Sequence, residues 1–303
     1  MQMAVPLRRV EVSMPELSQA VLELIRRTST DLSTDVEDSL HRARQAEEPG
    51  SAAAGALDTI LENVVLARSQ STPVCQDTGT PLFFVRHPAG WSTRRLREQI
   101  RQAVAEATRM SYLRPNAVDS VSGKNSGNNL GDDAFPTIHF EEAEGDELVI
   151  ELILKGGGCE NMGAQYSLPD DRLGAGRDLE GVRRALLDAV HQAQGYGCAP
   201  GILGVAIGGD RGSGFAASKE TFLRPLGDTN PDPKLAELEN RVYREANTLG
   251  IGPMGFGGKT TVLGVKAVNL HRLPACYFVS ISYMCWADRR RRMTVRGDDV
   301  VIE

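Results

Sequence analysis

The chain of 303 residues lacks the marks of several protein classes. No apolar run approaches the ~18 residues that a membrane-spanning helix needs, and residues 1–16 lack the charged-then-apolar pattern of a signal peptide. Lysine and arginine total 34 against 40 acidic residues, which gives a net charge of −6 and argues against the basic face of a nucleic-acid-binding protein. We therefore expect a cytoplasmic protein that binds neither nucleic acid nor membranes.

Cysteine is scarce, and its spacing excludes two common roles. The five cysteines are odd in number and form no CxxC pair, which argues against a disulfide framework and against paired zinc-ligand spacing. A single cysteine is most often a small buried side chain. Three of them, however, lie in the polar or glycine-rich segments PVCQDTGTP, GGGCENMG and GYGCAPG, and a fourth ends a strand-like segment before WADRR.

Several familiar catalytic and nucleotide-binding motifs are also missing. The chain contains neither GxSxG nor HExxH. GFGGKT is not a phosphate-binding loop, because that motif requires glycine where the chain has Pro253. GIGPMG fits the string GxGxxG but follows a predicted helix rather than a strand. Among the five histidines, His271 in the loop-like segment NLHRLPA is the most interesting candidate for chemistry.

Hydrophobic periodicity predicts an α+β fold. We expect a helical N-terminal part over residues 1–70, then a mixed, largely antiparallel sheet region with flanking helices, all in one compact domain of residues 1–303. The first two helices are predicted at 13–27 and 34–48, with capping boxes formed by Ser13 with Glu16 and by Thr34 with Glu37. These helices are interpreted as scaffold or as oligomer contacts.

The remaining segments predict strands, helices and polar loops. Residues 137–142 and 147–155 are strand-like and joined by a short acidic turn, so we expect them to form a β-hairpin. The helix over residues 179–194 is expected to end at a left-handed Gly195. Residues 113–136 are too long and turn-rich for an element, and loops of this length are usually functional or disordered.

Loops that carry cysteine and glycine together suggest a metal site. Glycine lets the backbone approach a bulky ligand closely and offers bare N–H donors. Soft sulfur ligands suit an iron–sulfur cluster or zinc. The spacing alone leaves two interpretations open, which are convergence of the thiolates on one metal centre and separate buried thiols.

Five segments, in order, resemble the α subunit or N-terminal domain of class I iron–sulfur hydro-lyases, the class I fumarate hydratases and L-tartrate dehydratases. They are PVCQDTGTP, KGGGCENMG, GCAPGILGVAIGG, LGIGPMGFGGKTTVLGV and CWADRR, and the resemblance runs from about residue 14 to 290. It implies a [4Fe–4S] cluster bound by three cysteines, which are Cys75, Cys198 and Cys285. Cys159 falls where the fumarase-like pattern reads GGGSEN and the tartrate-like pattern reads GGGC, so the resemblance implies a residue of the substrate loop rather than a ligand. Cys276 matches no ligand of the family.

The resemblance also implies the chemistry of the site. Three thiolates leave one iron of the cluster free to act as a Lewis acid toward a dicarboxylate. Gln76 and Asp77 are implied to be catalytic and to contact substrate. Arg114, in YLRPN, is similar to the family's carboxylate-binding arginine, whose planar fork suits that role. The further substrate contacts that the resemblance implies are Gly157, Gly158 and, less directly, His271.

The run of arginines over residues 289–292 has two interpretations. It could raise the local potential for anions, but a run of one charge is more often a solvated face.

The resemblance implies a separate α subunit that homodimerises and needs a β subunit, because single-chain members carry a second domain with further catalytic residues. The favoured reaction is the reversible hydration of fumarate to L-malate. The alternatives are dehydration of L-tartrate or a related hydroxy-diacid, a non-enzymatic iron–sulfur regulatory protein, and a zinc-binding structural domain.

Overall fold

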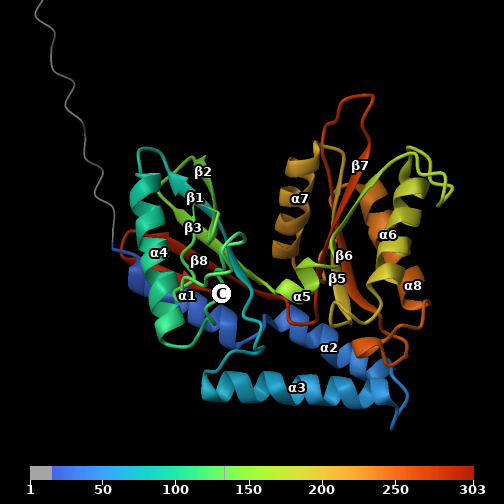
Figure 1. Ribbon diagram of the computed structural model, residues 1–303, viewed down its shortest axis with the longest axis horizontal. Helices are drawn as coiled ribbons and strands as arrows, with labels where there is room; N and C mark the ends of the chain where they lie inside the picture. The colour runs from blue at the N-terminus through green and yellow to red at the C-terminus, as the bar shows by residue number, and fades with distance from the viewer. Residues whose placement is uncertain (1–15, 133) are drawn as a thin grey trace, which may run out of the picture.

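The computed structural model describes residues 16–132 and 134–303 (Figure 1). Its N-terminal part is helical, as predicted, with α1 (Ser18–Thr30), α2 (Thr34–Ala46) and α3 (Ala52–Gln70). The capping box predicted at Thr34 is wrong, because Ser33 occupies the N-cap of α2 and its side chain makes no capping hydrogen bond. The capping box predicted at Ser13 lies outside the described residues.

The first sheet has five strands in the order β2-β1-β3-β8-β9. The strand β1 pairs with β2 in parallel and with β3 antiparallel, so the predicted hairpin of β2 and β3 is wrong. The physical reason is burial: β1 carries the apolar run LFFV and takes a central position, whereas β2 is half polar and lies at the edge. The bounds are β1 (Thr80–Pro88), β2 (Thr137–Ala143), β3 (Leu148–Lys155), β8 (Arg289–Arg296) and β9 (Asp299–Ile302).

The second sheet has four strands in the order β4-β7-β5-β6, and β5 at its centre is buried along its whole length. The strands β5 and β6 are parallel, while β7 runs antiparallel to both of its neighbours. The bounds are β4 (Ala164–Ser167), β5 (Gly201–Ile207), β6 (Val262–Asn269) and β7 (Phe278–Met284). Both sheets are mixed and most pairings are antiparallel, which confirms the predicted fold class.

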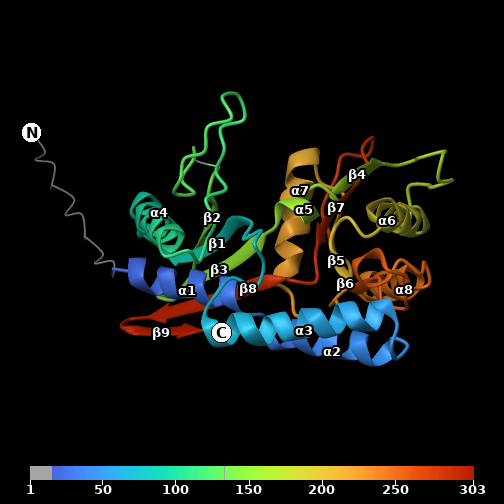
Figure 2. The same cartoon turned by 60° about the horizontal axis from the view of Figure 1, so that its bottom comes forward.

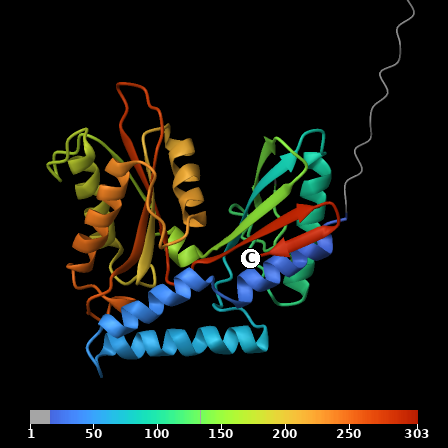
Figure 3. The same cartoon turned by 180° about the vertical axis from the view of Figure 1, so that it is seen from behind.

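Helices cover each sheet and build two hydrophobic cores. One core joins the first sheet to α1 and α4 (Thr93–Arg109), and the other joins the second sheet to α2, α3, α6 (Leu179–Ala193) and α8 (Pro233–Asn247). Figures 1 and 3 show α2 and α3 side by side along the base of the molecule. The shorter α7 (Arg211–Glu220) lies on the side of the second sheet that faces the first. None of the described helices combines the length and apolar character needed to cross a membrane.

The loop after α6 differs from the prediction at its glycine. The helix ends at Ala193, and Gln194 rather than Gly195 adopts a positive φ, of 46°. Glycine is required at 195 for another reason, because a Cβ there would lie 2.8 Å from the Cα of Gly255 and from the carbonyl oxygen of Met254. The two glycine loops GYGCAPG and GIGPMGFGG therefore pack backbone against backbone.

A close backbone contact also fixes the turn before β1. Gly79 has a φ of +78°, and a Cβ at this position would lie 2.6 Å from the carbonyl carbon and oxygen of Lys155. The turn that carries Cys75 is thereby held against the end of β3.

We expect Gly79→Ala to lower the free energy of unfolding by about 3 kcal/mol or more, because it adds a backbone overlap to left-handed strain. Gly50→Ala is the matched control, since Gly50 has a φ of +79° and open space around it. Gly50→Ala should lower the free energy of unfolding by about 1 kcal/mol. Urea unfolding of both variants measures these two free-energy changes. Equal decreases in the two variants would contradict the prediction, because they would show that the backbone overlap at Gly79 relaxes without a free-energy cost.

Candidate metal centre and active site

Four of the five cysteines lie at the ends of elements where the two sheets meet. Cys75 precedes β1, Cys159 belongs to the short helix α5 (Gly157–Glu160) after β3, Cys198 precedes β5, and Cys285 follows β7. Figures 1 and 2 show α5 between the two sheets. These positions follow from the topology, because β5 and β7 are antiparallel and the start of one lies beside the end of the other.

Hydrogen bonds and electrostatic interactions indicate that these four side chains lie near one another. The amide N of Trp286 donates to the carbonyl oxygen of Cys198 at 3.3 Å, so the segments of Cys198 and Cys285 lie side by side. The Cys159 and Cys285 side chains share a hydrogen bond. Burial, and then the charges of Cys75 and Cys159, raise the pKa of Cys198.

The fifth cysteine lies elsewhere. Cys276 is in the loop before β7, at the opposite end of that strand from Cys285. All five thiols are free of disulfide bonds.

A buried lysine accompanies the Cys159 thiol. The Lys155 side chain is 2% exposed, and its Nζ lies 3.4 Å from Cys159 Sγ and 3.1 Å from Glu160 Oε2. A hydrogen bond from Cys285, aided by Lys155 and opposed by burial, lowers the pKa of Cys159 to about 6. The same hydrogen bond, together with burial, raises the pKa of Cys285. The lysine was not predicted, although its place directly before GGG could have drawn attention to it.

The Asp77 carboxylate ties the Cys75 turn to the glycine loop. Its Oδ2 accepts hydrogen bonds from the amide N of Gly157 at 2.7 Å and of Gly158 at 3.3 Å, and its Oδ1 accepts from the amide N of Gly79 at 3.1 Å. Gly156 also lies against it, since a Cβ there would be 3.1 Å from Oδ2. Three residues predicted from the sequence, Asp77, Gly157 and Gly158, are therefore in direct contact.

The loop of residues 113–136 places Arg114 beside the Asp77 turn. The amide N of Arg114 donates to the Thr78 hydroxyl at 2.9 Å, next to Asp77. Asn129 is fully buried and holds this segment, with its Nδ2 donating to the carbonyl oxygen of Arg114 at 2.7 Å and its Oδ1 accepting from the amide N of Asn116 at 2.6 Å. Arg114 and Gln76 are exposed side chains at the edge of the site. The loop projects from the body of the protein in Figure 2.

The structure does not bring His271 to the cysteines of this chain. Its carbonyl oxygen accepts from the amide N of Gly209, just beyond the end of β5, whereas Cys198 precedes the start of β5. A seven-residue strand separates the two ends by roughly 20 Å.

The arginine run is only partly exposed. Arg289 and Arg290 are 1% and 7% exposed, so the interpretation of the whole run as a solvated face is wrong. Arg290 pairs with Asp35 and Asp288, and Arg291 lies 2.9 Å from Asp31. Asp31 and Asp35 come from a segment distant in sequence, and for that reason the local pattern gave no sign of burial.

Comparison with known proteins identifies the chain's family. Residues 18–294 match the sequence profile of the family described as Fumarate hydratase (Fumerase). The chain belongs to the fumarate hydratase (Fumerase) family.

Members of this family among curated proteins differ in length. A Geobacillus stearothermophilus protein named for class I fumarate hydratase is 49% identical over 91% of this chain, which spans 54% of that relative. Two L(+)-tartrate dehydratase α subunits, from Methanocaldococcus jannaschii and Escherichia coli, are 33% and 32% identical over 93% of the chain and are covered over 99% and 92% of their lengths. The chain thus spans about half of the first relative and nearly all of the other two.

The cysteines fit a cluster better than a single metal ion. Among the described residues, no three His, Cys, Asp or Glu side chains lie close enough together to hold one ion. An iron–sulfur cube stands between its thiolates, so its ligands can remain farther apart. Buried N–H groups of Arg289 that lack a partner among the described residues also fit a missing anionic group.

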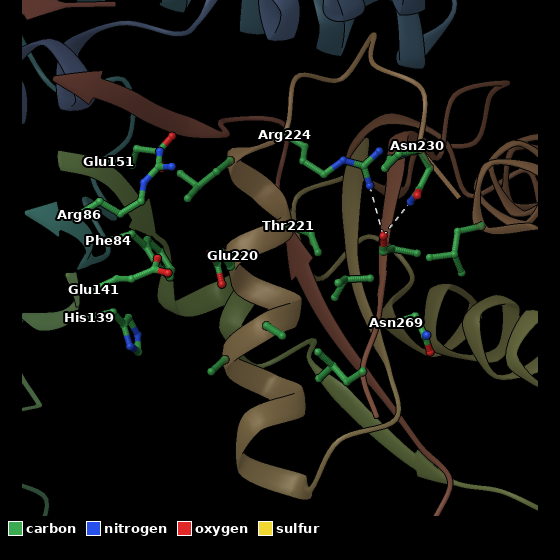
Figure 4. A pocket seen from close by; sticks show the side chains of 18 of the residues that line it. Phe84, Arg86, His139, Glu141, Glu151, Glu220, Thr221, Arg224, Asn230 and Asn269 are labelled. Carbon is green, nitrogen blue, oxygen red and sulfur yellow. Dashed lines mark hydrogen bonds and ion pairs between the residues drawn. The ribbon is translucent and has the colours of Figure 1, made fainter. Parts of the chain in front are cut away.

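A large pocket of this Fumerase-family chain lies apart from the cysteines. It has a volume of about 840 Å³ and is lined by the first sheet, α7, β6 and the segment that leads into α8, and Figure 4 shows Arg86, His139 and Glu151 on one side and Glu220 and Arg224 on the other. Burial raises the pKa of Glu220. No residue predicted for the site lines this cavity.

The buried carboxyl of Asp288, beside the arginine run, should make the stability of the fold depend on pH. Burial raises the pKa of Asp288 to about 6, whereas an exposed aspartate titrates near 3.9. Because the folded-state pKa is the higher one, the group favours folding below the unfolded pKa, and this contribution is lost as the pH rises through about 6.

We therefore expect the free energy of unfolding of Asp288→Asn, taken relative to that of the native sequence, to depend on pH. This difference should be more favourable to the variant by about 2 kcal/mol at about pH 7.5 than at about pH 4. Urea unfolding of both apoproteins at the two pH values measures this double difference. A difference that does not change with pH would contradict the prediction.

Proposed function

We propose that this chain is the α subunit of a [4Fe–4S]-dependent hydro-lyase that reversibly hydrates fumarate to L-malate. The observation that carries the proposal is the meeting of Cys75, Cys198 and Cys285 beside the Asp77–glycine contact. The family and the relative named for class I fumarate hydratase support the hydro-lyase class. A cytoplasmic location stays a prediction.

The three cysteines would hold the cluster, and the bound cluster would supply a Lewis-acidic iron that carries no thiolate ligand. Cys159 is not assigned as a ligand, because its thiol already accepts a hydrogen bond from Lys155 Nζ and donates one to the carbonyl oxygen of Gly156 at 3.2 Å. Its role is to keep the substrate loop attached to the end of β3.

The remaining side chains would bind and orient a dicarboxylate. The exposed guanidinium of Arg114 offers paired N–H donors to one carboxylate. The Gln76 amide, next to the ligand Cys75, can donate to a second oxygen. Asp77 is fixed by three backbone N–H groups, so its carboxylate is positioned in advance and can hold a proton near the reacting carbon.

We infer that a β subunit completes the site. Two relatives of nearly equal length are named as α subunits, and the longer relative has room for a second part. Among the described residues proposed here to bind substrate, Arg114 is the one cation, so a further cation for the second carboxylate of the substrate is expected from the β subunit. Homodimerisation of the α subunit is part of the same proposal.

Dehydration of L-tartrate is the second candidate. It is favoured by the names of the two relatives that the chain covers almost completely, and by cysteine at position 159, where the fumarase-like pattern has serine and the tartrate-like pattern has cysteine.

The test is an anaerobic assay of the reconstituted chain, alone and with the β subunit, on fumarate, L-malate and L-tartrate. We expect turnover of fumarate and L-malate with the β subunit, and a rate lower by about 100-fold or more without it, because substrate positioning of this kind contributes effects of that size. Preference for L-tartrate would select the second candidate. A fully active isolated chain would contradict the need for a partner, and a cluster-loaded complex inactive on all three would favour a regulatory protein.

A further inference from the structure

Arg289 is the largest fully buried side chain among the described residues, at 1% exposure. Its Nη2 makes one long hydrogen bond, of 3.4 Å, to the carbonyl oxygen of Leu154. Its Nε and Nη1 have no hydrogen-bond partner in the described part of the chain. A guanidinium stays protonated inside a protein, so the Arg289 side chain keeps its positive charge although it is buried.

The neighbouring arginines show that the fold can pair a buried cation. Arg290 has carboxylates from Asp35 and Asp288, and Arg291 has Asp31. Arg289 alone of these three has no carboxylate partner among the described residues, although it is the most deeply buried. The buried carboxylate of Asp288 is within electrostatic range of Arg289 but forms no ion pair with it. A buried charge without a paired counterion is strongly destabilising, so the free N–H groups of Arg289 call for a further anion.

The position of Arg289 indicates which anion this is. Arg289 begins β8, opposite Leu154 on β3, and follows Cys285 by four residues. The Arg289 guanidinium lies within electrostatic range of the Cys285 side chain. A solvent-borne substrate does not reach a side chain that is 1% exposed, whereas a cluster attached to Cys285 is part of the interior.

We propose that Arg289 is a positioning residue for the iron–sulfur cluster, with its free N–H groups donating to sulfur at the Cys285 corner and its charge offsetting that of the thiolates. This inference rests on the proposed binding of a [4Fe–4S] cluster by Cys75, Cys198 and Cys285. Hydrogen bonds and charge near the sulfurs are among the factors that set the reduction potential of such clusters. Arg289 thus stabilises the cluster-loaded protein and destabilises the fold of the apoprotein.

The two states therefore respond to mutation in opposite directions. Arg289→Met removes the charge and keeps an unbranched side chain, so the apoprotein should unfold at the same or a higher temperature. The reconstituted cluster should release iron to a chelator about tenfold faster, because a charge-assisted hydrogen bond is lost. Its reduction potential should be more negative, since reduction adds charge that the cation no longer offsets.

Two further variants complete the anaerobic experiment. Arg289→Lys keeps the charge without the fork, and its reduction potential should return toward that of the native sequence. Arg292→Met is the control, because Arg292 is an exposed member of the same strand, and it should match the native chain in all three readouts.

The outcomes separate the two proposals. A lower unfolding temperature of apo Arg289→Met would make Arg289 a structural residue and overturn the inference. A native reduction potential and native iron release in Arg289→Met would overturn it as well. If the native chain itself binds no cluster under these conditions, the proposed function fails and the inference fails with it.

Discussion

Serine in place of Cys75, Cys198 or Cys285 is expected to abolish stable binding of the [4Fe–4S] cluster. Each substitution removes one of three thiolates, and a serine hydroxyl is a harder ligand that keeps its proton near neutral pH. After anaerobic reconstitution, each variant should retain under about a tenth of the iron bound by the native sequence. Hydration with the β subunit should fall with the cluster.

The other two cysteines are the matched controls. Cys276→Ser should keep full iron and sulfide, because Cys276 lies at the opposite end of β7 from Cys285. Cys159→Ser should also keep the cluster, since the fumarase-like form of the loop has serine there. A native cluster content in the Cys75, Cys198 or Cys285 variant would remove that residue from the ligand set, and loss of the cluster in Cys159→Ser would add a ligand.

Asp77→Asn is expected to lower kcat/KM by about 10²–10⁴-fold while leaving the cluster content unchanged. The amide has nearly the shape of the carboxylate, but it cannot hold a proton. It also places an NH₂ group where the amide N–H groups of Gly157 and Gly158 require an acceptor. Steady-state kinetics of the complex with the β subunit measure the effect.

Asp171→Asn serves as the control for this substitution, because Asp171 is an exposed aspartate outside the site. A native kcat/KM in Asp77→Asn would show that Asp77 is only a link between two loops. A loss of iron in parallel with activity would show that its main effect is on the cluster.

Much of the site could be predicted because its residues lie in short polar segments with little to bury. Cys75, Asp77 and the glycine loop stand out in this way, and the structure brings them together. The helical N-terminal part could also be predicted, because its periodicity is local. Strand partners are not local information, and nothing in residues 137–155 shows that β1 separates the two strands.

The residues that sequence analysis missed depend on distant parts of the chain. Burial of Arg290 requires Asp35, which is 255 residues away, and the isolation of Arg289 becomes visible only once its neighbours are seen to be paired. Lys155 is buried like an apolar residue although its side chain is charged, so hydrophobic periodicity alone does not assign its role. Asn129 holds the Arg114 segment across a loop that the sequence shows only as turn-rich.

The most direct measurement is the iron and sulfide content of the native chain after anaerobic reconstitution, combined with its Mössbauer spectrum. We expect about four irons and about four sulfides per chain, with one iron whose signal differs from the others and responds to added dicarboxylate. A chain that takes up zinc alone, or binds no more iron than its triple variant of Cys75, Cys198 and Cys285, would contradict the account.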